Sequence, residues 1–163
     1  MAVVFGLLML PHTAMSQQKS IKEEIVGAWA LVSVTAERAD GSKGEPFGDN
    51  PKGIIIFTPD GLFSLLQSRA DVPKLAENDR AKATPEEAKA IVSSSIAYYG
   101  TYSVNEAEKS LSVKIEASTF SNLIGPEQKR IVTLLTVDEL KFTNPATPAG
   151  VTLQTAWKRA SAK

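Results

Sequence analysis

The sequence contains no cysteine and only one histidine, His12. The lack of cysteine excludes disulfides, thiolate nucleophiles and cysteine-based zinc sites. There is also no surplus of charge of one sign, because 18 Lys and Arg side chains face 18 Asp and Glu side chains. Binding to nucleic acid requires an excess of basic residues, so this balance argues against it.

The chain is long enough for one globular domain and little more. It has 163 residues, of which 43% are hydrophobic. That apolar fraction is sufficient for a packed core, which excludes a wholly disordered chain. We therefore expect a single domain.

The N-terminal segment is typical of an export signal. An apolar run over residues 2–10 is followed by Pro11 and the small-residue stretch Ala14-Met15-Ser16, although no basic residue precedes the run. The alternative is a buried or disordered N-terminal tail. We expect cleavage after residue 16, a periplasmic or secreted protein, and no stable membrane anchor, since the run is too short to span a bilayer.

Cleavage would leave 147 residues (163 − 16) and would also remove His12. No histidine-based triad and no histidine metal or haem ligation would then remain. Any catalysis would have to use Asp, Glu, Lys, Arg or Tyr. We expect no catalytic residue, no metal and no cofactor.

Two helix starts stand out within a pattern of β-strands. Ser20 and Glu23 have the spacing of a capping box, and Gly27 ends the short helix that this box opens. Residues 17–24 are expected to form a linker and the start of this helix. Thr84 precedes Pro85 and two glutamates, which predicts a second helix to about residue 95. The domain itself is expected over residues 25–160.

Strand patterns fill most of the remaining chain. The first begins at Ala28, with Trp29, Leu31, Ser33 and Thr35 expected on one face. A hairpin is predicted from residues 53–58 and 62–68, and further strands over residues 98–104, 110–118, 130–136, 139–143 and 151–159. Eight strands joined mostly by hairpins predict an all-β fold, an up-and-down antiparallel barrel with a short N-terminal helix and one inserted helix.

Several stretches resemble the bacterial lipocalin-like domain family. They are GAW at 27–29, PFGDNPKGIIIFTPDG at 46–61, R-x-D-x-P at 69–73, TPEE at 84–87, YYGTYSV at 98–104 and FSNLIG at 120–125. The resemblance covers about residues 25–159. It implies a calycin-type barrel with an apolar cavity open at one end, and barrels of this kind generally carry small apolar molecules.

A barrel of eight strands is either filled by its own side chains or holds one small ligand. Candidate ligand-binding residues are Phe57, Phe63, Tyr98, Tyr102 and Arg69. The alternative for each aromatic residue is an ordinary place in the core. The two tyrosines could orient a ligand carbonyl or hydroxyl group.

The spacing of these tyrosines places Gly100 between them on one strand face. A glycine there leaves room for another group to approach the backbone. Arg69 has two interpretations. In the first, it pairs with Asp71 or holds the loop in place. In the second, residues 69–95 form a lid over the barrel mouth, and Arg69 or Arg80 binds a ligand carboxylate.

A second group of residues is predicted to close the barrel. The resemblance implies that a basic residue of the last strand, Lys158 or Arg159, lies across Trp29, which follows Gly27 at the barrel entry. Such a contact would be a cation–π interaction. Trp157 belongs to the same group and is expected to be structural.

Three functions remain open on the sequence alone. The favoured one is an exported protein that binds a small apolar or amphipathic molecule in its barrel. The second is a non-covalent cyclase or isomerase that works without His and Cys. The third is a solid barrel that acts as a structural or partner-binding module.

Overall fold

The computed structural model describes residues 19–161. The predicted signal segment over residues 1–16, including His12, lies outside the described residues. None of the helices within residues 19–161 is long and apolar enough to cross a membrane.

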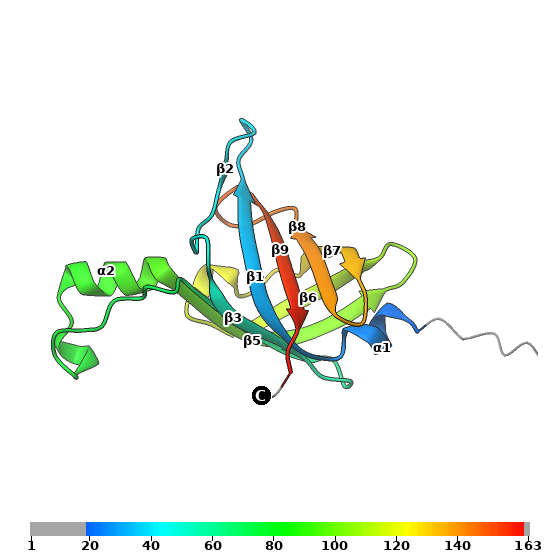
Figure 1. Cartoon of the computed structure of the whole chain (residues 1–163), viewed down its shortest axis with the longest axis horizontal. Helices are drawn as coiled ribbons and strands as arrows, with labels where there is room; N and C mark the ends of the chain where they lie inside the picture. The colour runs from blue at the N-terminus through cyan, green and yellow to red at the C-terminus, as the bar shows by residue number, and fades with distance from the viewer. Residues whose placement is uncertain (1–18, 162–163) are drawn as a thin grey trace, which may run out of the picture.

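One antiparallel sheet closes on itself to form a barrel of eight strands (Figure 1). The barrel strands are β1 (Gly27–Glu37), β3 (Lys52–Phe57), β4 (Leu62–Ser68), β5 (Ser95–Asn105), β6 (Ser110–Ser118), β7 (Gln128–Leu135), β8 (Glu139–Asn144) and β9 (Thr152–Arg159). Each pairs with its neighbour in chain order, and β1 also pairs with β9. The short strand β2 (Lys43–Gly44) adds to the edge of β1. The predicted all-β, up-and-down antiparallel barrel is confirmed.

Strand β1 departs from the predicted alternation because it contains a bulge. Its register to β9 shifts between Leu31 and Ser33, so one extra residue stands in β1 at Val32. Beyond the bulge Val34 points inward and is buried, while Ser33 and Thr35 line the outer surface. The prediction that Ser33 and Thr35 share a face with Trp29 is therefore wrong, since a one-residue insertion reverses the face of every later side chain.

Helix α1 (Ile21–Ile25) covers one end of the barrel. Its capping box forms as predicted: the Ser20 side chain accepts from the Glu23 backbone N–H, and the Glu23 carboxylate accepts from the Ser20 N–H. The carboxylate of Glu106, from the turn between β5 and β6, accepts from the N–H groups of Ile21 and Lys22 at 3.0 Å each. Ile25 is fully buried at this closed end.

The core of the barrel is solid next to α1. Large side chains from several strands meet there with almost no exposed surface; they include Trp29, Phe57, Leu111, Ile115, Leu140 and Trp157. Packing of this density leaves no room for a ligand beside α1.

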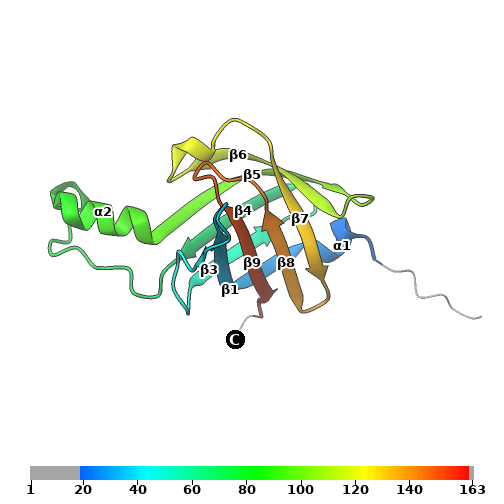
Figure 2. The same cartoon turned by 90° about the horizontal axis from the view of Figure 1, so that it is seen from above.

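Helix α2 (Pro85–Ser94) leads directly into β5 and stands away from the barrel (Figure 2). Thr84 caps it as predicted, and Thr84 also forms a second capping box with Glu87. The preceding loop contains the 3-10 turn η1 (Arg80–Lys82), and a second 3-10 turn, η2 (Ser121–Leu123), follows β6.

Candidate functional site

The end of the barrel opposite α1 contains a cavity of about 240 Å³. It is formed where β1, β4, β5, β7, β8 and β9 reach their ends, together with the loops that follow β2, β6 and β8. Most of its wall is apolar; the lining residues are Ala36, Pro46, Phe47, Gln67, Ile96, Tyr98, Phe120, Leu123, Arg130, Asn144, Thr147, Pro148, Ala149, Val151 and Leu153. The barrel is thus solid at the closed end and hollow at the open end.

Three polar side chains of this cavity are buried. Gln67, Arg130 and Asn144 expose 5%, 6% and 7% of their surface. They come from different strands, β4, β7 and β8, and they occupy inward positions that the strand alternation would normally give to apolar residues. Within residues 19–161, Arg130 is the only charged residue that lines the cavity.

The Arg130 guanidinium is held by its own strand. It donates from Nη2 to Gln128 Oε1 at 2.8 Å and from Nη1 to the Lys129 carbonyl at 3.2 Å. Gln128 in turn donates from Nε2 to the Leu123 carbonyl at 3.1 Å. No carboxylate within residues 19–161 forms an ion pair with Arg130.

Asn144 contributes a polar atom that has no partner. Its side-chain oxygen is fully buried and accepts no hydrogen bond from the part of the chain that the structure describes. The register of β7 and β8 pairs Ile131 with Thr143, so the next position places Arg130 opposite Asn144. A buried unpaired oxygen lowers the stability of the fold by about 1–3 kcal/mol unless a bound molecule or a water donates a hydrogen bond to it.

The structure places the predicted aromatic residues along the length of the barrel. Tyr98 lines the cavity. Its ring packs edge-on against Phe63 at 6.0 Å between centroids, and Phe63 stacks on Phe57 at 6.2 Å. Phe57 and Phe63 are buried below the cavity and do not line it.

Tyr102 lies at the far end of this row of aromatic rings. Its hydroxyl donates to the Thr58 carbonyl at 2.7 Å, and its ring meets Phe57 edge-on at 5.0 Å. Burial raises the pKa of the Tyr102 phenol, and the negative charge of Asp60 adds to that rise. Tyr98 and Tyr102 share a strand face, as predicted, but only Tyr98 reaches the cavity.

Gly100 lies between the two tyrosines, and the space beside it is filled. A Cβ atom on Gly100 would meet the Lys114 carbonyl oxygen of β6 at 1.9 Å. The group that approaches the backbone here is therefore the neighbouring strand and not a ligand. The register between β5 and β6 also shifts at this point, between Tyr99 and Gly100.

Arg69 lies outside the cavity, on the outer rim. Its Nε and Nη2 donate to the two carboxylate oxygens of Asp71 at 2.8 and 3.0 Å. This bidentate hydrogen bond holds the pKa of Asp71 below its usual range and raises the pKa of Arg69. The structure thus shows the first of the two interpretations of Arg69, pairing with Asp71.

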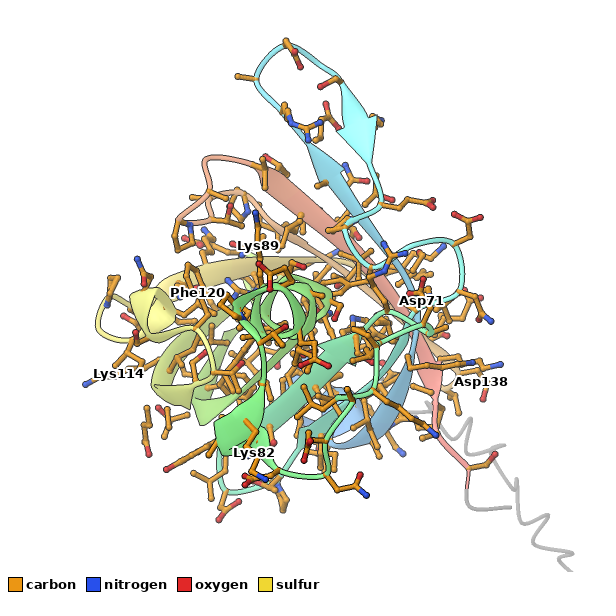
Figure 3. All side chains as sticks on the ribbon, turned by 90° about the vertical axis from the view of Figure 1, so that its left-hand side faces the viewer. Asp71, Lys82, Lys89, Lys114, Phe120 and Asp138 are labelled. Carbon is orange, nitrogen blue, oxygen red and sulfur yellow. The ribbon has the colours of Figure 1, made fainter. Side chains whose placement is uncertain are left out.

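The predicted lid over residues 69–95 does not contribute to the cavity wall. None of these residues is among those that line it. Figure 3, seen from the side of α2, shows Phe120 and Asp71 on opposite sides of the helix. Phe120 of the cavity rim and the Arg69–Asp71 pair are therefore separate features.

Arg159 closes the opposite end of the barrel. Its guanidinium stacks on the ring of Trp29 and donates to three backbone carbonyls. Gly27 adopts a positive φ of 120° directly below it, where a Cβ would meet Arg159 Nη1 at 3.1 Å. Lys158 is exposed, and Trp157 instead stacks on Phe142 inside the barrel.

Sequence reasoning missed the three buried polar residues of the cavity. A signal was present for Arg130: in QKRIVTLL it lies two residues before the apolar Val132, so strand alternation places both on one face. A charged residue at an inward position is rare in a structural core. Gln67 gave the same signal after Phe63 and Leu65.

No group of three or more potential ligand residues that could hold a metal ion occurs within residues 19–161. The acidic residues of this region are distributed over the outer surface and the loops. Among the described residues, no Asp, Glu or His lines the cavity.

A match to a known protein family agrees with the barrel. A family model described as a lipocalin-like domain matches residues 26–160. A redesigned β-barrel, mFAP1, bound to DFHBI is 15% identical with a TM-score of 0.44, covering 86% of this chain and all of that one. A second structure, EF1p2_mFAP2b bound to DFHBI, is 14% identical with a TM-score of 0.40, covering 85% of this chain and 95% of that one. No curated protein matches the chain at a significant level.

Proposed function

The chain belongs to the lipocalin-like domain family, and we propose that it binds a small amphipathic molecule in the cavity at the open end of the barrel. The observation that carries this proposal is the combination of an apolar wall with a buried, unpaired Asn144 oxygen. Pockets for small molecules share this composition, in which apolar walls supply affinity and a few polar groups fix orientation.

The size of the cavity limits the ligand. At about 240 Å³ it is smaller than the pockets that enclose drug-sized molecules, which measure roughly 300–1,000 Å³. Phe120 is exposed at the rim, so a longer ligand would extend past it into solvent. Burial of apolar ligand surface would contribute about 25 cal/mol per Å² to binding.

We propose export for the same protein, on the basis of the apolar run over residues 2–10 and the small residues before Gln17. N-terminal sequencing of the protein from its native cells tests this. A mature chain that begins at Gln17 is expected, and an intact N-terminus in the cytoplasm would contradict export.

The test of ligand binding is native mass spectrometry of the protein purified from its own cells. We expect an added mass that is lost on denaturation. A matched pair of variants locates the site: Ala36→Phe fills the cavity, whereas Ala156→Phe adds the same ring to the outer face of the neighbouring strand β9.

The added mass should disappear in Ala36→Phe and persist in Ala156→Phe. The proposal is wrong if the wild-type protein carries no added mass and none of the small molecules offered to it binds. The open end would then belong to a structural module. If the mass persists in both variants, the ligand binds elsewhere on the molecule.

A further inference from the structure

We propose that the ligand is an acid: a molecule with one carboxylate and an apolar body, whose carboxylate pairs with Arg130. This inference rests on the proposed function and adds the chemical class of the ligand. The apolar wall of the cavity would hold the body, and the carboxylate would lie against Arg130 on the inner face of the barrel.

The first argument is the unused hydrogen-bonding capacity of Arg130. A guanidinium has five N–H donors in a planar fork. Two of them are used, one toward Gln128 and one toward the Lys129 carbonyl. The remaining three donors have no acceptor among residues 19–161. A carboxylate matches this geometry because it accepts two parallel N–H bonds from one guanidinium.

The second argument is the uncompensated charge. Arg130 exposes only 6% of its surface and is the one charged residue of the cavity wall. A buried cation is unfavourable unless an anion pairs with it. The nearest acidic residue in sequence, Glu127, is exposed and forms no ion pair with Arg130.

The third argument comes from the support around the guanidinium. The chain of hydrogen bonds from Leu123 through Gln128 fixes one edge of Arg130 and leaves its other donors free. The neighbouring Asn144 oxygen is also without a partner. A carboxylate has no hydrogen to donate to this oxygen, so it would pair with Arg130, and Asn144 would accept from another group of the ligand or from water.

The test compares three probes with the same eight-carbon chain: octanoate, octan-1-ol and octylammonium, titrated calorimetrically at pH 7.5. One charge-assisted contact corresponds to roughly a 10- to 100-fold gain in affinity. We therefore expect octanoate to bind the wild-type protein at least tenfold more tightly than octan-1-ol, and octylammonium to bind most weakly.

Arg130→Gln should remove the preference for octanoate over octan-1-ol. The matched control is Arg69→Gln, which removes the same charge from the outer rim, where Arg69 pairs with Asp71. Should Arg130→Gln fail to fold, Asn144→Asp provides an independent test. It places a carboxylate opposite Arg130 and should exclude octanoate while octan-1-ol still binds.

The outcomes separate the two proposals. Two results would overturn the acid ligand but not the binding site. One is equal binding of octanoate and octan-1-ol to the wild-type protein, and the other is an unchanged preference for octanoate in Arg130→Gln or Asn144→Asp. The absence of binding for all three probes would overturn both. A preference that is lost in Arg130→Gln and retained in Arg69→Gln would establish the acid ligand.

Discussion

The guanidinium carbon of Arg159 lies 3.7 Å from the centroid of the Trp29 ring. The same guanidinium donates to the carbonyls of Val26 and Glu24 at 2.8 Å each and to that of Val137 at 2.9 Å. A single side chain on the last strand thereby joins the end of α1, the first strand and the turn between β7 and β8. The contact closes the barrel at its solid end.

We predict that Arg159→Lys destabilises the fold. Lysine has one ammonium group and no planar fork, so it cannot stack on Trp29 and reach three carbonyls together. The free energy of unfolding should fall by about 2 kcal/mol in urea denaturation. Lys158→Ala is the control, because Lys158 is exposed and should change stability by less than about 0.5 kcal/mol. Equal stability of Arg159→Lys and the wild-type protein would refute the role of this contact.

A second prediction concerns the close approach of β5 and β6. In Gly100→Ala the new methyl group would stand 1.9 Å from the Lys114 carbonyl oxygen, so the two strands would have to move apart. We expect a loss of about 3 kcal/mol in the free energy of unfolding. Gly44→Ala is the matched control, because no atom lies within 4 Å of a Cβ there. A stable Gly100→Ala protein would show that the strands separate at little cost.

A third prediction uses the raised pKa of Tyr102. Burial favours the neutral phenol in the folded state, so its folded pKa lies above the ordinary value of 10.0. The stabilisation that results is fully present below pH 10 and is lost as the pH rises through the folded pKa, because the folded state binds more protons there.

Tyr102→Phe removes both the titrating group and its hydrogen bond to Thr58. We expect it to be less stable than the wild-type protein by about 1 kcal/mol at pH 7. This difference in the free energy of unfolding should be smaller above pH 10 than at pH 7. Urea denaturation of both proteins at the two pH values measures it. Ligand binding should be unchanged, whereas Tyr98→Ala should weaken it, because only Tyr98 lines the cavity. A constant difference across the pH range would mean that Tyr102 titrates normally.

The fold was largely predictable because local rules determine it. The hairpin around Pro59-Asp60-Gly61, the capping box at Ser20 and the helix start at Thr84 all appear in the structure as expected. Each depends on residues close together in the sequence. The bulge at Val32 was not predictable, since it depends on how β1 meets both β3 and β9.

The candidate site was less predictable, because it is made by the ends of strands that lie far apart in sequence. Tyr98 could be identified from its strand face. Arg130 and Asn144 became neighbours only through the register of β7 and β8. Which of the aromatic residues reach the cavity depended on where the solid core ends, and no sequence pattern contains that information.

The last prediction concerns the loop before α2, which Glu87 ties to the helix. The Glu87 carboxylate accepts from the N–H of Thr84 at 2.9 Å and from that of Ala76 at 2.8 Å. These two backbone hydrogen bonds lower the pKa of Glu87 below its ordinary value of 4.5. Their stabilising effect is therefore present above pH 4.5 and is lost as the pH falls through the lowered pKa.

Glu87→Ala should release the loop at pH 7.5, because the Ala76 N–H then loses its acceptor. Trypsin has three sites within residues 70–84, at Lys74, Arg80 and Lys82. We expect cleavage there to become several-fold faster, while the barrel itself stays resistant, since exposed local segments open independently of the core. Glu86→Ala is the control, as it removes an exposed carboxylate of the same first turn and should leave cleavage unchanged. Equal rates for the two variants would show that the loop is held by contacts other than Glu87.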